Sequence, residues 1–218
     1  MDTKIFAIRI GDRYGPEYEE YLNSKLPNIT WIRKPFSEKV LFQWNKLFLM
    51  NLDIDEPIIV IDIDILLIND YMELFNYPIN SNEFLSIHSW WKDTDNPNYS
   101  MNGGFQKFYP KKCKYIFDKF ISDPIYWQQY YIKNGTTIGP VNGEQYFVED
   151  SVREQLHLKL APSEWVCRFK NKYDMDWLAN LNTKYPGDYA FLDQFNPLIK
   201  LVHYNQFNHL PLTPAIDA

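Results

Sequence analysis

Apolar and polar positions in the first third of the chain follow two alternating periods. Short apolar runs rich in β-branched residues indicate strands, and apolar residues spaced three and four apart indicate helices. The predicted strands cover residues 4–10, 29–32 and 57–61, and the predicted helices between them cover residues 17–26 and 38–50. Ser37 is the expected N-cap of the second helix. This strand–helix–strand–helix–strand order predicts a parallel sheet with right-handed crossovers.

The remaining two thirds of the chain continue this mixture less regularly. Strands are expected at residues 84–88, 101–109, 156–160 and 198–203, the second of them entered through a turn at residues 102–104. Helices are expected at residues 111–121 and 143–150, and residues 123–143 contain an aromatic helix or loop. Because no internal repeat, low-complexity tract or linker interrupts the sequence, residues 1–218 are expected to form a single α/β domain.

Two carboxylates interrupt the most apolar stretch, which reads EPIIVIDIDILLIND over residues 56–70. Side chains two apart on a strand project to the same side, so Asp62 and Asp64 should lie together. Adjacent carboxylates at the end of a buried strand repel each other and lose hydration, and a cation between them would remove both penalties. A plainer interpretation is that the acids only end the strand, with Asn69 and Asp70 capping a following helix.

Charge and composition narrow the possible partners. A formal net charge of -6 argues against a nucleic-acid partner, which would need a basic surface. No apolar run is long enough for a membrane span. Two cysteines are too few for a disulfide framework, and the N-terminus begins with a strand rather than a signal peptide. These features together predict a cytoplasmic protein.

The segment NKLFLMNLDIDEPIIVIDIDILLINDYMELF resembles the central block of the metal-dependent glycosyltransferases of the GT-A fold, and most closely the glycogenin-like family 8 enzymes. This resemblance implies a single Rossmann-like GT-A domain, with a mostly parallel central sheet flanked by helices and a smaller antiparallel C-terminal part. It also implies that Asp62 and Asp64 bind Mn²⁺ or Mg²⁺, which would bridge the diphosphate of a nucleotide sugar. Lys46 corresponds to the lysine that reaches the donor, and Ile63 lies between the two acids at the same donor site.

Four shorter motifs extend the resemblance in the family's order. MNGGF resembles the family's turn F-N-S-G-x-F, which implies that Asn102, Gly103 and Gly104 contact the donor sugar. IRIGDRY resembles the family's strand followed by N-x-x-Y, which implies a uracil pocket formed by Ile8, Arg9 and Tyr14.

The two motifs nearer the C-terminus concern the chemistry. NGEQYF resembles G-G-D-Q-x, which implies that Glu144 and Gln145 are catalytic residues. KLVHY resembles K-V-V-H-F, which implies that His203 is a third metal ligand.

The resemblance implies transfer of a hexose from a UDP-sugar to an acceptor hydroxyl, with retention at the anomeric carbon because the Glu144–Gln145 pair keeps the family's acid–amide order. The acceptor could be a glycan, protein, lipid or small molecule. The chain departs from the family after His203, where it reads YNQFNHLP in place of a glycine followed by Lys-Pro-Trp, so the phosphate-binding lysine is missing.

Two other functions remain open from the sequence. An apolar strand ending in D-x-D also opens phosphatases of the haloacid dehalogenase type, and GDYAFLD, residues 187–193, nearly matches their later motif. No apolar strand precedes that segment, however, and two strand–helix units come before Asp62. A non-catalytic sugar-nucleotide-binding relative would keep the same fold and lack the C-terminal lysine.

Overall fold

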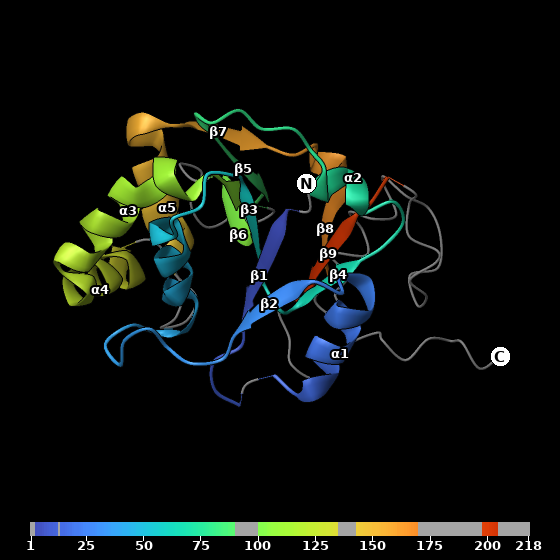
Figure 1. The fold of residues 1–218 in the computed structure, drawn as a ribbon, viewed down its shortest axis with the longest axis horizontal. Helices are drawn as coiled ribbons and strands as arrows, with labels where there is room; N and C mark the ends of the chain where they lie inside the picture. Colours follow the sequence, from blue (N-terminus) through green and yellow to red (C-terminus); the bar gives the residue numbers. More distant parts are fainter. Residues whose placement is uncertain (1–2, 13, 90–99, 135–142, 170–197, 205–218) are drawn as a thin grey trace.

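A computed structural model describes residues 3–12, 14–89, 100–134, 143–169 and 198–204. Within these ranges, a six-stranded sheet is covered by helices on one side and by α1 and a second, three-stranded sheet on the other (Figure 1). The larger sheet has the order β2-β1-β3-β6-β5-β7. Its strands are β1 (Lys4–Ile8), β2 (Ile29–Ile32), β3 (Ile58–Ile61), β5 (Glu83–His88), β6 (Met101–Phe108) and β7 (His157–Leu160).

The expected parallel start of the sheet is confirmed. β1 pairs in parallel with both β2 and β3, and β5 pairs in parallel with β7. Among the described strands of this sheet, only β6 runs antiparallel to its neighbours, β3 and β5. Because β1 lies between β2 and β3, the chain crosses from one side of β1 to the other after β2. The strand order therefore reverses at β1, and open sheets of this kind bind ligands at the carboxyl ends of the strands beside such a switch point, here β1 and β3.

Two hydrophobic clusters lie on opposite faces of β3. Ile58 and Val60 belong to the cluster under the helices, and Ile59 and Ile61 belong to the cluster on the other face. All four side chains are buried, as expected for a central strand covered on both sides. The helices are α1 (Pro16–Lys25), α2 (Met72–Phe75), α3 (Pro110–Ser122), α4 (Pro124–Asn134) and α5 (Glu144–Gln155), with short 3-10 helices η1 (Phe42–Asn51) and η2 (Ser163–Trp165).

The helix predicted over residues 38–50 is wrong in type and in its beginning. The structure has the 3-10 helix η1 instead, which starts at Phe42 without a side-chain cap. The hydroxyl of Ser37 accepts a local bond from the amide of Lys39, at 3.3 Å, and does not cap η1. The buried Asn45 side chain donates to the carbonyl oxygens of Val40 and Phe42 and accepts from the amide of Phe36, so it holds the preceding segment in a non-helical path.

The segment around the two acids forms one strand more than predicted. After β3, the chain turns through residues 62–64 and forms β4 (Ile65–Leu67), which pairs antiparallel with β9 (Leu201–Tyr204), and β9 pairs in parallel with β8 (Val166–Phe169). The expected caps of the next helix are absent, because α2 follows Tyr71 with no side-chain cap. Asn69 instead donates to the carbonyl oxygen of Ile199 and ties β4 to the C-terminal segment.

Candidate active site

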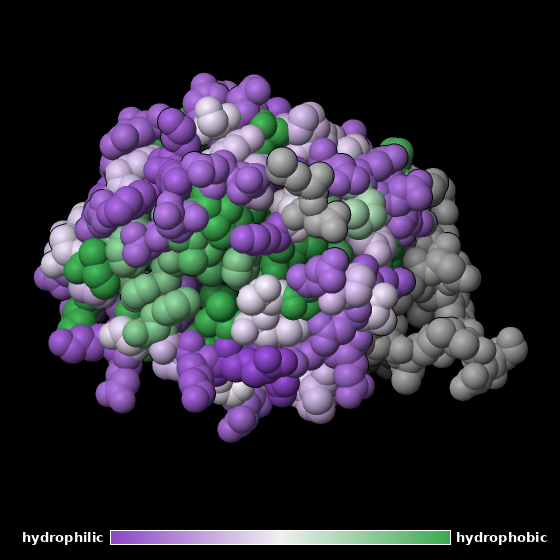
Figure 2. Space-filling model, in the orientation of Figure 1, coloured by the Kyte–Doolittle hydropathy of each residue, from purple (hydrophilic) through white to green (hydrophobic). Residues whose placement is uncertain are grey.

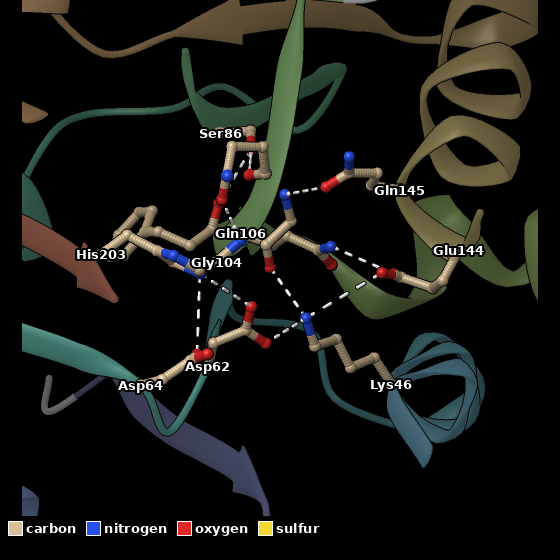
Figure 3. A network of polar contacts seen from close by, with 12 residues as sticks. Lys46, Asp62, Asp64, Ser86, Gly104, Gln106, Glu144, Gln145 and His203 are labelled. Atoms are coloured by element: carbon tan, nitrogen blue, oxygen red, sulfur yellow. Dashed lines mark hydrogen bonds and ion pairs between the residues drawn. The ribbon is translucent and has the colours of Figure 1, made fainter. Parts of the chain in front are cut away.

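Asp62, Asp64 and His203 form one cluster at the carboxyl end of β3. Register places Ile65 opposite His203 in the β4–β9 pair, which brings the imidazole beside the turn that carries both acids. His203 Nε2 lies 3.5 Å from Asp62 Oδ2 and 3.6 Å from Asp64 Oδ1 (Figure 3). One ligand atom from each of the three residues fits within a 4.8 Å group. The structure therefore brings together the three side chains that the resemblance had suggested as metal ligands.

The two carboxylates of this cluster have opposite electrostatic environments. Although burial raises the pKa of Asp62, Lys46 and His203 outweigh it and lower that pKa to about 2. Burial raises the pKa of Asp64, and the neighbouring charge of Asp62 raises it further. The hydroxyl of Tyr14 donates to Asp64 Oδ2 at 2.8 Å, which opposes part of that rise. His203 also opposes the rise, and the pKa of Asp64 still lies above its ordinary value, so the cluster contains one firmly ionised carboxylate and a second whose charged form is less favoured.

This donor set fits a divalent cation. Oxygen and imidazole ligands suit Mn²⁺, and carboxylate oxygen suits Mg²⁺. Ligands about 2.1 Å from an octahedral ion lie roughly 3.0 Å apart when adjacent and about 4.2 Å apart when opposite. The separations of 3.5 and 3.6 Å lie between these values. Asp62, Asp64 and His203 could therefore hold such an ion with small side-chain adjustments.

Lys46 joins this cluster to a second buried carboxylate. Its ammonium group lies 2.5 Å from Asp62 Oδ1 and 3.9 Å from Glu144 Oε2, and it donates to the carbonyl oxygen of Gly103 at 2.9 Å. Its side chain is 3% exposed. Burial alone would lower its pKa, but the two carboxylates raise it, so the ammonium remains charged. η1 thus supplies one buried positive charge to a predominantly acidic site.

Glu144 and Gln145 begin α5 and face β6. Gln106 Nε2 donates to Glu144 Oε1 at 3.2 Å, and the amide of Gly103 donates to Gln145 Oε1 at 3.2 Å (Figure 3). Burial raises the pKa of Glu144 to about 7, assisted by Asp62 and opposed by Lys46 and Gln106. Close to neutral pH, this carboxyl group is therefore protonated in a large share of the molecules.

The predicted turn at residues 102–104 is wrong, because these residues lie within β6. Their strand is irregular, with a register shift opposite Ser86 and Ile87. Gly104 packs tightly: a Cβ there would lie 2.8 Å from Asn102 Oδ1 and 2.8 Å from His203 Cδ2. Its carbonyl oxygen also accepts from the amide of Asp62 at 3.0 Å. The absence of a side chain at Gly104 therefore lets β6 approach the candidate metal ligands.

The three N-terminal residues predicted for the uracil pocket lie in different environments. Tyr14 reaches the cluster through Asp64, and its ring packs edge-on against Tyr18. Arg9 instead forms an ion pair with Glu19 at 2.9 Å and donates to the carbonyl oxygen of Tyr14, so it braces the loop that carries Tyr14. Ile8 is half-buried and ends β1, two residues before the predicted end of this strand.

Ile63, predicted at the donor site, is buried in the core, and most of the segment after His203 lies outside the described residues. The Ile63 side chain is 4% exposed and packs in a hydrophobic cluster, so the ligand-facing groups of this turn are those of the flanking acids. The segment after His203 that lacks the family lysine lies outside the described residues, as do residues 187–193.

Sequence reasoning missed Gln106, a site residue that only the fold reveals. It is fully buried on β6, donates to Glu144, and its Oε1 has no hydrogen-bond partner among the described residues. Gln106 lies two residues after Gly104, so strand alternation could have placed the two on one side. The sequence offered no sign, however, that β6 borders α5.

Comparison with solved structures identifies the architecture. The glycosyltransferase GlyE of Streptococcus pneumoniae TIGR4 matches with a TM-score of 0.58 and 13% identity, covering 94% of this chain and 55% of GlyE. The galactosyltransferase LgtC, solved in complex with donor and acceptor sugar analogs, matches with a TM-score of 0.56 and 13% identity, covering 94% of this chain and 87% of LgtC. The chain has the GT-A fold.

A third structure extends the GT-A likeness to an animal protein. Mouse xyloside xylosyltransferase 1 matches with a TM-score of 0.52 and 11% identity, covering 96% of this chain and all of the mouse chain. The chain thus spans about half the length of GlyE and nearly the whole of the other two. No protein-family model and no curated protein sequence matches the chain. The GT-A resemblance of the sequence is therefore confirmed at the level of the fold.

Proposed function

We propose that this GT-A chain is a metal-dependent glycosyltransferase that moves a hexose from a UDP-sugar to an acceptor hydroxyl. The observation that carries the proposal is the Asp62–Asp64–His203 cluster at the sheet's switch point, with the buried cation of Lys46 beside it. A nucleotide sugar presents a diphosphate, which would need these cationic partners in an otherwise acidic protein. Mn²⁺ or Mg²⁺, when bound by the three residues, would supply a Lewis acid for the leaving diphosphate.

Each neighbouring residue has a role that its contacts support. Lys46 holds Asp62 ionised and in place, and its positive charge would favour an anionic diphosphate at this cluster. Tyr14 fixes Asp64 through its hydroxyl and offers a ring beside the loop after β1, where Ile8 and Arg9 would border the uracil. In this proposal the sugar of the donor is contacted by four further residues, which are Asn102, Gly103, Gly104 and Gln145.

Retention of the donor's anomeric configuration is supported by the position of Glu144. An inverting transferase needs a carboxylate base that takes the acceptor proton on the face opposite the leaving group. Glu144 is only 3% exposed and is held between Lys46 and Gln106, which leaves it poorly placed to receive that proton. Asp62 and Asp64 are committed to the metal. In this proposal Gln145 stabilises the sugar cation and the leaving phosphate accepts the proton.

Turnover of a panel of UDP-hexoses with Mn²⁺, followed by release of UDP, tests the proposed activity. At least one donor should give metal-dependent UDP release, either to water or to an added sugar acceptor. Asp64→Asn should abolish it, and Asp70→Asn, at an exposed aspartate outside the cluster, should leave it unchanged. Metal-independent release, or equal rates in the two variants, would contradict the proposed activity.

The two alternative functions predict different results with the same protein. A haloacid dehalogenase-type phosphatase would release phosphate from small phosphomonoesters with Mg²⁺ and lose that activity in Asp62→Asn. The GT-A fold now favours glycosyl transfer over this alternative. A non-catalytic relative would bind UDP with metal and release no sugar from any donor.

A further inference from the structure

Each carboxylate of the Asp62–Asp64–His203 cluster divides its two oxygens between the cluster and a second side chain. Asp62 Oδ2 lies 3.5 Å from His203 Nε2, while Asp62 Oδ1 pairs with Lys46 (Figure 3). Asp64 Oδ1 lies 3.6 Å from His203 Nε2, while Asp64 Oδ2 accepts a hydrogen bond from the hydroxyl of Tyr14 at 2.8 Å. Lys46 and Tyr14 therefore each hold one carboxylate so that its other oxygen faces the imidazole.

Tyr14 is itself held through its ring and its backbone, in both cases by way of helix α1. Its ring packs edge-on against the buried Tyr18, with ring centroids 5.0 Å apart. Its carbonyl oxygen accepts from Arg9 Nε at 3.2 Å, and Arg9 is ion-paired with Glu19 of the same helix. Because its hydroxyl reaches Asp64, Tyr14 joins the loop after β1 to the candidate metal cluster.

We propose that Tyr14 couples binding of the donor's nucleobase to binding of the divalent metal, with its hydroxyl positioning Asp64. The inference rests on the proposed function, in which the uracil lies against the ring of Tyr14 and the metal is held by Asp62, Asp64 and His203. It goes beyond that function, because a base pocket and a metal cluster can lie side by side without either one affecting the other. Tyr14 is a positioning residue for the metal and does not itself bind it.

The hydroxyl should strengthen metal binding by orienting one of the ligands. The hydrogen bond from Tyr14 to Oδ2 keeps Oδ1 of Asp64 directed toward His203. Side chains that orient a metal ligand in this way typically change metal affinity by about 10- to 100-fold. Lys46 holds Asp62 separately, so loss of the Tyr14 hydroxyl should release Asp64 alone.

The coupling should be positive, because both ligands favour one arrangement of the same contact. A base stacked on the ring of Tyr14 holds the hydroxyl against Asp64 Oδ2. A metal ion at Oδ1 holds the carboxylate in the orientation that accepts this hydroxyl. Each ligand therefore raises the affinity of the other, and by thermodynamic linkage the factor is the same in both directions.

Uridine is the probe that isolates this coupling, because it has no phosphate to bridge the base and the metal. Isothermal titration gives its affinity with and without Mn²⁺, and the electron paramagnetic resonance signal of free Mn²⁺ gives the metal affinity. Saturating Mn²⁺ should raise the affinity for uridine at least about fivefold, and saturating uridine should raise the affinity for Mn²⁺ by the same factor. Neither measurement depends on turnover.

Tyr14→Phe keeps the ring and removes only the hydroxyl. This variant should bind uridine without metal as the original chain does, bind Mn²⁺ about 10- to 100-fold more weakly, and lose most of the coupling. Any direct contact between the metal and the ribose would survive in this variant, so the difference belongs to the hydroxyl. The matched control is Tyr71→Phe, which removes a 2.9 Å hydrogen bond to the carbonyl oxygen of Lys25, outside the cluster, and should change none of these values.

Hydrophobic residues elsewhere on the surface need a separate control, because exposed rings could also stack with uridine. Figure 2 shows such residues around η1 and the neighbouring helices, although no helix in the described part of the chain is long and apolar enough to cross a membrane. Tyr126 of α4 is 50% exposed. Tyr126→Ser should leave both uridine affinity and coupling unchanged, and loss of uridine binding in this variant would overturn the proposal.

The possible failures separate this inference from the proposed function. If UDP does not bind the original chain in the presence of Mn²⁺, the proposed function is wrong and the coupling with it. If UDP and Mn²⁺ bind together but uridine and Mn²⁺ bind independently, only the coupling is wrong. The same holds if the coupling persists in Tyr14→Phe. Circular dichroism melting would confirm that the variants fold, and the coupling in the original chain tests the proposal without any variant.

Discussion

Replacing Glu144 by glutamine should make the protein more stable at alkaline pH, by an amount that depends on pH. The side chain is 3% exposed, and its pKa is raised from 4.5 to about 7. The folded protein therefore holds this proton more tightly than the unfolded chain does. Stability from this group is fully present below about pH 4.5 and is lost as pH rises through about 7.

The size of this effect follows from the shift in pKa. A shift of about 2.5 units corresponds to about 3 kcal/mol. Glutamine keeps the shape of Glu144 and cannot ionise, so the difference in unfolding free energy between variant and original should change by about that amount between pH 4 and pH 8. For a chain of this size the change corresponds to roughly 6–12 °C in Tm. The buried Oε1 of Gln106 could also accept a hydrogen bond from the new amide.

Urea denaturation of both proteins at several pH values measures this difference directly. Titrations shared by the two proteins cancel in the comparison. Glu20→Gln, at an exposed glutamate, controls for the substitution itself and should give a difference that does not change with pH. A pH-independent difference for Glu144→Gln as well would show that Glu144 is ionised at neutral pH, and would refute the argument from burial.

Three further predictions concern neighbouring residues. Lys46→Met should destabilise the protein by about 3–5 kcal/mol in urea denaturation, because it leaves Asp62 and Glu144 without their buried cation; unchanged stability would contradict the assigned ion pairs. Gly104→Ala should cost about 1–3 kcal/mol and weaken Mn²⁺ binding, since its Cβ would lie 2.8 Å from His203. Gly103→Ala, with its nearest contact at 3.2 Å, is the milder control, and equal effects of the two would count against the close approach. Proton NMR of the fresh product should show an α-linked sugar from an α-donor; a β-product would make Glu144 the base and end the assignment of retention.

Local sequence patterns predicted β1, α1, β2 and β3 because each of these elements depends mostly on its own residues. β3 reads as a buried strand from its uninterrupted apolar run, and the structure confirms it on both faces. Asp62 and Asp64 lie together because they are neighbours in the chain. β4 was not anticipated, since Ile65–Leu67 continues the same apolar run and only the turn at the two acids separates the strands.

Features that depend on distant residues could not be read from local patterns. η1 departs from a regular α-helix because Asn45 and Gln128 hold the preceding residues through side-chain hydrogen bonds. His203 joins the acids through strand pairing across most of the chain, so only the family resemblance suggested it. Gln106 belongs to the site only because α5 packs against β6, a contact between segments that are distant in the sequence.

Binding of UDP with and without Mn²⁺ tests the central claim most directly. Isothermal titration should show UDP binding that is strong with Mn²⁺ and much weaker without it, and Asp64→Asn should remove the metal-dependent part while the protein remains folded. A thermal shift should accompany binding, because a ligand at a hundredfold excess over its Kd stabilises the native state by about 2.7 kcal/mol. UDP affinity that is absent, or that is the same with and without Mn²⁺, would contradict a metal-assisted donor site at Asp62, Asp64 and His203.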